Sequence, residues 1–94
     1  MVDIKQLITQ AMALQQQGHV TQAAQLYEEV LKHEPMQFGA LVLLGTIYCQ
    51  QRHFERGIAL IEKALQVSPD SAMANTNLGL AYQKLGAWEK ALTH

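Results

Sequence analysis

The stretch FGALVLLGTIYCQQRHFERGIALIEKALQVSP, residues 38–69, decides the fold because an earlier stretch repeats it. Residues 4–35 align with it without a gap, at a shift of 34 residues. The identical pairs are Leu7 and Leu41, Gln16 and Gln50, Gln17 and Gln51, His19 and His53, Leu26 and Leu60, Glu28 and Glu62, Leu31 and Leu65, and Pro35 and Pro69. A further shift by the same amount matches Ala40, Leu44, Gly45, Tyr48 and Glu55 with Ala74, Leu78, Gly79, Tyr82 and Glu89. One supersecondary unit has therefore been copied, and each copy needs its neighbours to bury its apolar face.

The size and charge of the chain limit what it can be. Ninety-four residues, of which 49% are hydrophobic, suffice for one small domain with one core. Seven basic and eight acidic residues give a net charge of −1, which leaves no source for the positive face that nucleic-acid binding requires. Cys49 is the only cysteine, so an internal disulfide and a site with several thiolate ligands are excluded. We expect no nucleic-acid partner, no metal and no cofactor.

The sequence gives no sign of a membrane segment or a secretory signal. No apolar run approaches the ~18 residues that a membrane-spanning helix needs. The first residues, 1–5, lack the charged segment followed by an apolar block that marks a secretory signal. These observations predict a cytoplasmic protein without a membrane partner.

Prolines, glycines and capping residues predict where helices begin and end. No alternating apolar and polar run is bounded by turn residues, so we expect no strands. A first helix should begin at Asp3, whose carboxylate can cap free amides, and end near Gln17, before Gly18 and His19. A second helix should end before Pro35, which lacks an amide donor. The corresponding third and fourth helices should cover about residues 37–51 and 54–67, with a proline again following.

The third unit is shorter than the other two. Asp70 or Ser71 should cap a fifth helix that ends near Leu85, Gly86 should form the next turn, and Trp88 should begin a sixth helix. We therefore expect a single domain over residues 1–94, with repeats at about 4–37 and 38–71 and a truncated third repeat at 72–94.

The repeated residues resemble the tetratricopeptide repeat (TPR) family. The family pattern is a large residue, Leu-Gly, Tyr, a turn glycine, Ala, an aromatic residue, Ala and Pro. In the middle unit the matching residues are Leu41, Leu44, Gly45, Tyr48, Gly57, Ile61, Ala64 and Pro69. The resemblance implies an all-α fold, a right-handed superhelix (α-α solenoid) of stacked antiparallel helical hairpins. Departures such as Arg52 in place of the turn glycine leave the phase of the repeat intact.

Small residues recur where the two helices of each hairpin should touch. Helices approach to the short end of the ~8–10 Å packing range only where both present tiny side chains. The expected contacts are Ala11 with Ala23, Gly45 with Gly57, and Gly79 with Ala91, with Tyr27, Tyr48 and Tyr82 filling the spaces beside them. A coiled-coil hairpin, the alternative, would require a period of about 3.5 residues and no proline in every unit.

The resemblance also implies a concave surface, or groove, lined by the first helix of each hairpin. The residues that this geometry places in the groove are Ile8, Met12, Val42, Leu43, Thr46, Met73, Asn77 and Leu80. We therefore predict a non-catalytic scaffold that binds a peptide or helix of another protein there. For Val42 and Leu43 the alternative is packing between neighbouring units.

Some TPR proteins hold a C-terminal carboxylate with lysine, asparagine and arginine side chains. The equivalent positions here are Ile8, Met12, Leu43, Met73 and Asn77. Only Asn77 is polar, so a carboxylate would go largely unpaired. An apolar groove with two methionines favours an amphipathic helix or a neutral peptide, because methionine adapts to varied shapes.

An alternative hypothesis is that the chain is the recognition arm of a larger enzyme. The stretch 75–79, Asn-Thr-Asn-Leu-Gly, resembles the asparagine-bearing repeats that precede the catalytic part of glycosyltransferases acting on protein hydroxyls. Of the inner-wall asparagines in those repeats, only Asn77 has a match, since Thr9 and Leu43 hold the other two places.

The chain itself shows no catalytic constellation, and we predict that it is not an enzyme. His19 and His53 occupy the same turn in successive units, while His33 and His94 lie near helix ends, where surface positions are expected. No residue near Cys49 in the sequence would lower the pKa of its thiol, so we expect a buried structural cysteine.

The last unit predicts self-association. A repeat array needs a polar terminal helix to cover its last apolar face. Here that face carries Leu78, Tyr82, Leu85, Trp88 and Leu92. We expect a homodimer, or exchange of the last helix between two copies, through these residues.

Overall fold

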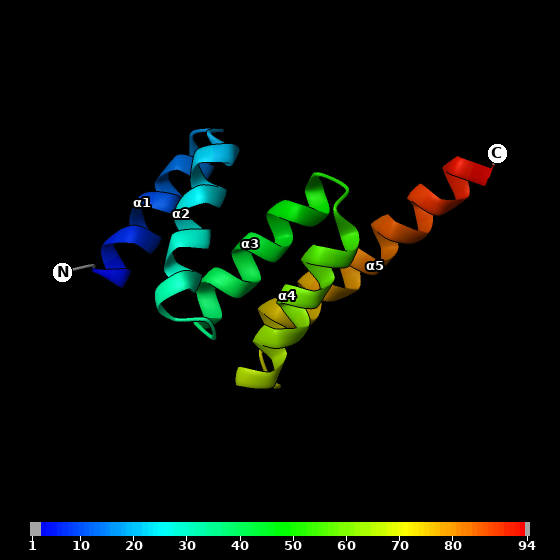
Figure 1. Ribbon diagram of the computed structural model, residues 1–94. Coiled ribbons are helices and arrows are strands. Elements are labelled where there is room, and N and C mark those ends of the chain that lie inside the picture. The colour runs from blue at the N-terminus through cyan, green and yellow to red at the C-terminus, as the bar shows by residue number, and fades with distance from the viewer. Residues whose placement is uncertain (1–2, 94) are drawn as a thin grey trace.

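The computed structural model describes residues 3–93, which form five helices and, within that range, no strand. The helices are α1 (Ile4–Gln16), α2 (Val20–His33), α3 (Phe38–Gln50), α4 (Phe54–Val67) and α5 (Ala72–Thr93). Figure 1 shows α1 and α2 as one hairpin, α3 and α4 as the next, and α5 passing behind α4 and extending away from the other helices. None of these helices is both long and apolar enough to cross a membrane. The predicted all-α fold of stacked helical hairpins is confirmed.

Capping residues and a glycine set several helix ends as predicted. The Asp3 carboxylate accepts a hydrogen bond from the backbone amide three residues later (3.2 Å) and caps α1. After α1, Gly18 adopts φ = +87°, a left-handed conformation that glycine takes without steric cost. Asp70 and Ser71 were the two candidate caps for α5. Ser71 is the cap, because its hydroxyl accepts a hydrogen bond from the Ala74 backbone amide (3.1 Å).

The prolines and an arginine shape the remaining turns. Pro35 and Pro69 lie just after α2 and α4, and the residue before each proline leaves helical geometry, as proline requires. In the turn between α3 and α4, Arg52 has φ = +69°, which costs a residue with a side chain roughly 1–2 kcal/mol. Its guanidinium carbon lies 4.4 Å from the ring centre of Trp88, and this cation–π contact offsets part of that cost.

Two clusters of apolar side chains form the core. The first joins α1, α2 and α3, and the second joins α3, α4 and α5. The helices α3 and α4 cross closely, and a Cβ built on Gly45 would stand 2.7 Å from the carbonyl oxygen of Gly57. The predicted contact between these two glycines is therefore confirmed. Ala11 and Ala23, the corresponding residues of α1 and α2, are both completely buried.

The prediction of a turn at Gly86 is wrong. One helix, α5, runs without interruption from residue 72 to residue 93, so no sixth helix begins at Trp88. A turn would break backbone hydrogen bonds of the helix, and packing of a following helix would have to offset that cost. Only Ala91 and Leu92 follow Trp88 as apolar residues, whereas α4 buries five residues. Continuing the helix retains its backbone hydrogen bonds without the cost of starting a new one.

The straight course of α5 removes two further predicted contacts. Gly79 and Ala91 lie in the same helix, roughly 18 Å apart by its rise per residue, and both are exposed. Tyr82 is 49% exposed, whereas Tyr27 and Tyr48 are buried as predicted. The division into repeats 4–37, 38–71 and 72–94 stays a prediction, and Met1, Val2 and His94 lie outside the described residues.

Candidate functional site

Five of the predicted groove residues present apolar surface on α1, α3 and α5. Met12, Met73 and Leu80 are 44%, 47% and 48% exposed. Ile8 and Leu43 are partly buried and pack against the first core cluster. These side chains can therefore offer apolar contact to a ligand without disturbing the core.

Val42, by contrast, belongs to the core. Its side chain is completely buried in the second cluster and has no surface to offer a ligand. The sequence could not show that Val42 is buried and Leu43 partly exposed, because α3 buries eight of its residues and is apolar on nearly every side. Packing between neighbouring units was the alternative role for both residues. Val42 has that role, whereas Leu43 keeps part of its side chain exposed to solvent.

A shallow hollow lies where α1 approaches α3. Its lining residues are Met12, Gln15, Gln16 and Leu43, and its volume is about 290 Å³. The side-chain oxygen of Gln15 accepts a hydrogen bond from the Tyr27 hydroxyl (3.0 Å). This bond fixes the Gln15 amide so that its nitrogen, a donor with two protons, is the group left to meet a ligand.

The polar residues of the groove tie α5 to α3. The side-chain nitrogen of Asn77 donates to the Thr46 hydroxyl (3.1 Å), and that hydroxyl donates to the Val42 carbonyl (2.9 Å). Both side chains are half-buried. The repeat pattern predicts both residues in the groove but not their contact, because they belong to different units and match no repeated pair.

The cysteine is buried, and two of the histidines lie in equivalent turns. Burial raises the pKa of the Cys49 thiol, and the positive charge of Lys84 opposes that shift more weakly. The thiol therefore stays protonated and unreactive near neutral pH. His19 and His53 stand just before α2 and α4, in the equivalent turns where the repeat places them.

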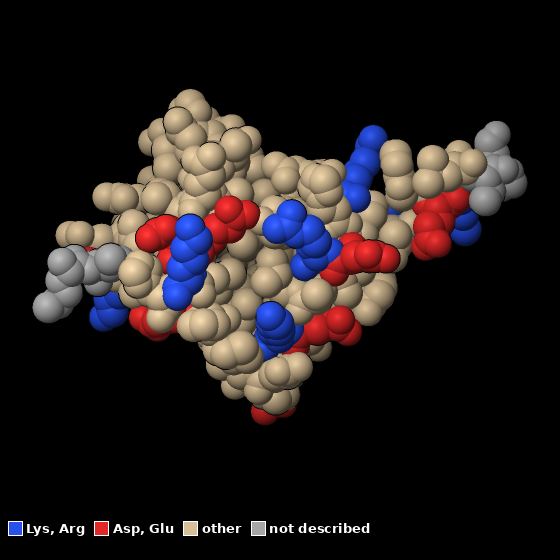
Figure 2. Space-filling model, viewed as in Figure 1, with Lys and Arg blue, Asp and Glu red and all other residues tan. Residues whose placement is uncertain are grey.

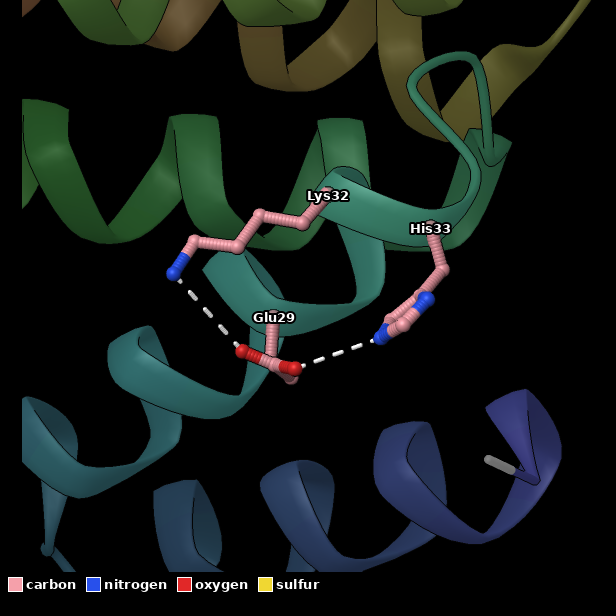
Figure 3. Close-up of polar contacts among 3 residues, drawn as sticks. All are labelled: Glu29, Lys32 and His33. Atoms are coloured by element: carbon pink, nitrogen blue, oxygen red, sulfur yellow. Dashed lines mark hydrogen bonds and ion pairs between the residues drawn. The ribbon is translucent and has the colours of Figure 1, made fainter. Parts of the chain in front are cut away.

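The outer face of α2 carries a small group of charges. Figure 3 shows the Glu29 carboxylate between Lys32 and His33, with the Lys32 nitrogen at 3.8 Å and the His33 Nε2 at 3.2 Å. Exposed pairs at this helical spacing contribute only ~0.2–0.5 kcal/mol each. Within residues 3–93, no group of three or more His, Cys, Asp or Glu side chains is arranged to hold a metal ion.

A larger hollow, which sequence analysis missed, lies between α2 and α4. Its volume is about 570 Å³, and its lining residues are Glu28, Leu31, Lys32, Leu44, Tyr48, Arg56, Ala59, Leu60 and Lys63. The 34-residue shift pairs its basic residues Lys32, Arg56 and Lys63 with Gln66, Gln22 and Glu29, so no repeated basic residue could have signalled it. In Figure 2, where α4 faces the viewer, basic and acidic side chains are interspersed and neither sign dominates.

A chain of three side chains crosses this hollow and joins three helices. The Tyr48 hydroxyl donates to the Glu28 carboxylate and accepts from an Arg56 nitrogen (3.1 Å). Burial is the main cause that raises the pKa of Tyr48 to about 12. The hydrogen bond to Glu28 and its negative charge add to the rise, while Arg56 opposes it. Tyr48 is thus a neutral donor that links α2, α3 and α4.

The residues predicted for self-association do not share one open surface. Leu78, Leu85 and Trp88 are partly buried against the second core cluster. Tyr82 is half-exposed, and Leu92 is 67% exposed near the first turn of α4. Only the last two therefore retain much surface for another molecule.

Comparison with known proteins places the chain in a family. The profile of the family described as "Anaphase-promoting complex, cyclosome, subunit 3" matches residues 6–94. The mouse protein "Interferon-induced protein with tetratricopeptide repeats 2" is 34% identical over 65 residues, or 69% of this chain. The bovine "BBSome complex member BBS4" is 34% identical over 53 residues, or 56% of this chain.

A third relative comes from Arabidopsis thaliana. The protein "Probable UDP-N-acetylglucosamine--peptide N-acetylglucosaminyltransferase SEC" is 34% identical over 77 residues, or 82% of this chain. The aligned parts make up 14%, 10% and 8% of the three relatives, so the chain spans only a small fraction of their length. Together with the stacked hairpins, the profile match over nearly the whole sequence shows that the chain is a TPR-type protein and belongs to the family described as anaphase-promoting complex, cyclosome, subunit 3.

Proposed function

We propose that this chain binds a peptide or a helix of another protein along the groove formed by α1, α3 and α5. Membership of a TPR-type family supports the general class, a non-catalytic scaffold for protein interaction. The observation that carries the groove proposal is that Met12 on α1 and Met73 and Leu80 on α5, all predicted groove residues, are about half-exposed apolar side chains.

The chemistry of the groove favours an apolar or amphipathic ligand. None of the proposed contact residues is charged, so a ligand carboxylate would lose its hydration without gaining a cationic partner. The methionines suit apolar side chains of varied shape. The amides of Gln15 and Asn77, both fixed by hydrogen bonds, are suited to the polar groups of a peptide backbone.

A second candidate function is the recognition arm of a larger enzyme that adds sugars to proteins. The printed name of the Arabidopsis relative, a peptide N-acetylglucosaminyltransferase, favours this candidate, although the match covers 8% of that protein. Under both hypotheses this chain supplies binding and no chemistry, and a cytoplasmic location stays a prediction. The two differ in whether the native protein continues beyond residue 94 into a catalytic domain.

Selection from a phage-displayed library of random peptides tests the groove. Affinities of the selected peptides would be measured by fluorescence anisotropy for the original chain and for Met12→Lys and Met73→Lys. Each substitution places a strongly hydrated charge among apolar contacts and should weaken binding at least about tenfold. Circular dichroism should show unchanged helix content, because both side chains are about half-exposed.

Val67→Lys is the matched control. Val67 is 46% exposed, close to the two methionines, but it lies at the end of α4 outside the groove. Its substitution should leave peptide affinity unchanged. Peptides that tolerate both methionine substitutions, or that respond equally to Val67→Lys, would rule out the groove as the binding surface.

A further inference from the structure

The hollow between α2 and α4 is more positive than the chain as a whole. Three cationic side chains line it, those of Lys32, Arg56 and Lys63, against one carboxylate, that of Glu28. The whole chain, by contrast, has a net charge of −1. In Figure 2 basic side chains stand apart from one another on this face, with tan surface between them. The hollow is therefore a local site of positive charge, and its cations are spread around it.

These cations are available to a ligand. Within the part of the chain that the structure describes, Lys63 is exposed and takes part in no hydrogen bond or ion pair. Lys32 has an exposed partner, Glu29, at 3.8 Å, and such surface pairs are weak. Arg56 uses one of its five N–H donors on the Tyr48 hydroxyl, so other donors can meet an anion.

The one carboxylate in the hollow is already engaged. Glu28 accepts a hydrogen bond from the Tyr48 hydroxyl, and the same hydroxyl accepts one from Arg56. The guanidinium carbon of Arg56 also lies 4.4 Å from the centre of the Tyr48 ring. Through Tyr48, Glu28 and Arg56 offset each other's charge. The excess positive charge of the hollow therefore lies on Lys32 and Lys63.

Between the cations the hollow is apolar. Leu31, Leu44, Ala59 and Leu60 line it, and all except Leu44 keep surface exposed to solvent. The volume, about 570 Å³, lies within the ~300–1,000 Å³ range of ligand pockets. A ligand that fits has an apolar group for this surface and negative charges spread around that group. A peptide with carboxylate side chains on both sides of an apolar residue has this arrangement.

We propose that the hollow between α2 and α4 is a second binding site, which takes an acidic peptide segment of a partner protein. An apolar side chain of the segment packs onto Leu31 and Leu60, and the flanking carboxylates lie near Lys32 and Lys63. Complementary charge of this kind favours the acidic segment over neutral and basic ones. The groove, whose proposed contact residues are uncharged, takes a different class of ligand.

Selection of phage-displayed random peptides on a chain carrying Met12→Glu and Met73→Glu tests the proposal. These substitutions make the groove unfavourable for both apolar and acidic peptides. We expect the selected peptides to contain Asp or Glu beside a large apolar residue. Their affinity would then be measured by fluorescence anisotropy on the original chain. Lys63→Glu should raise the dissociation constant at least about tenfold, and replacing the apolar residue of the peptide by serine should do the same.

Lys5→Glu is the matched control. Lys5 is exposed on α1, outside the hollow, and its substitution changes the net charge by the same amount. It should leave the affinity for acidic peptides unchanged. A selection that yields no acidic peptides would overturn the proposal. So would peptides that tolerate Lys63→Glu, or that Lys5→Glu weakens as much, because net charge alone would then explain their binding.

The two binding sites are tested independently. Acidic peptides from either selection bear on the hollow, and all other peptides bear on the groove. Either proposal can therefore fail without the other.

Discussion

Gly45 and Gly57 bring the backbones of α3 and α4 into direct contact, and a single methyl group is enough to disturb this crossing. A Cβ on Gly45 would lie 2.7 Å from both the Gly57 oxygen and the Ile61 side chain. The side chain can move, but the carbonyl cannot move without shifting α4. The hairpin geometry therefore rests on residue size at this position.

We predict that Gly45→Ala lowers the free energy of unfolding by about 1–3 kcal/mol. The loss arises although alanine favours a helix by roughly 1 kcal/mol over glycine, because overpacking outweighs that preference. Urea denaturation monitored by circular dichroism measures the change. Gly79→Ala, at an equivalent position with open space, should instead stabilise the monomer by about 0.5–1 kcal/mol in dilute solution. Equal effects at the two positions would contradict the account.

Tyr48 makes stability depend on pH in the alkaline range. Its folded pKa of about 12 exceeds the ordinary value of 10.0, so the fold favours the neutral hydroxyl. This contribution is complete below about pH 10 and is lost as the pH rises toward 12, because the ionised phenol is less costly in the unfolded chain. The loss should reach roughly 2–3 kcal/mol, because each unit of pKa difference corresponds to about 1.4 kcal/mol.

Comparing the free energy of unfolding of the original protein with that of Tyr48→Phe separates the titration of Tyr48 from that of other groups that titrate at alkaline pH. At neutral pH the variant should be less stable by about 1 kcal/mol, because it lacks the hydroxyl that Glu28 and Arg56 contact. The difference between the two proteins should shrink as the pH rises above 10. Urea titrations at several pH values measure it, and a difference independent of pH would refute the role assigned to Tyr48.

At the scale of elements, the sequence predicted most helix ends because local residues determine them. Pro35 and Pro69 end two helices through their own covalent structure, and Gly18 turns the chain wherever it lies. Gly86 resembled Gly18, but a turn at Gly86 depends on distant packing that the following residues do not supply. Tertiary packing, which the local sequence does not contain, decided that α5 is one helix.

Alanine in place of these two glycines gives effects of opposite sign. In a continuous α5, Gly86→Ala should raise the free energy of unfolding by about 0.5–1 kcal/mol, because alanine is the better helix former. Gly18→Ala should lower it by about 1–2 kcal/mol, because φ is +87° there. Urea denaturation monitored by circular dichroism measures both. A destabilising Gly86→Ala would indicate a turn at that residue.

For the whole molecule, the candidate groove was predicted better at its exposed ends than at its centre. Met12, Met73 and Leu80 lie on helices with polar neighbours, so helical periodicity separated their outer and inner faces. Val42 lies on a helix that is apolar nearly all round, and only the packed structure shows that it is buried. The basic residues that line the hollow between α2 and α4 do not repeat, so periodicity gave no sign of a charged hollow there.

We infer that ligand binding takes place on the inner faces of α1, α3 and α5. Backbone and methyl NMR spectra, recorded as a library-selected peptide without acidic residues is added, locate the binding surface residue by residue. We expect shifts concentrated at Met12, Leu43, Thr46, Met73 and Asn77, with residues on the outer faces of α2 and α4 unchanged. Shifts concentrated instead around the hollow between α2 and α4, at residues such as Leu31, Leu60 and Lys63, would rule out the groove.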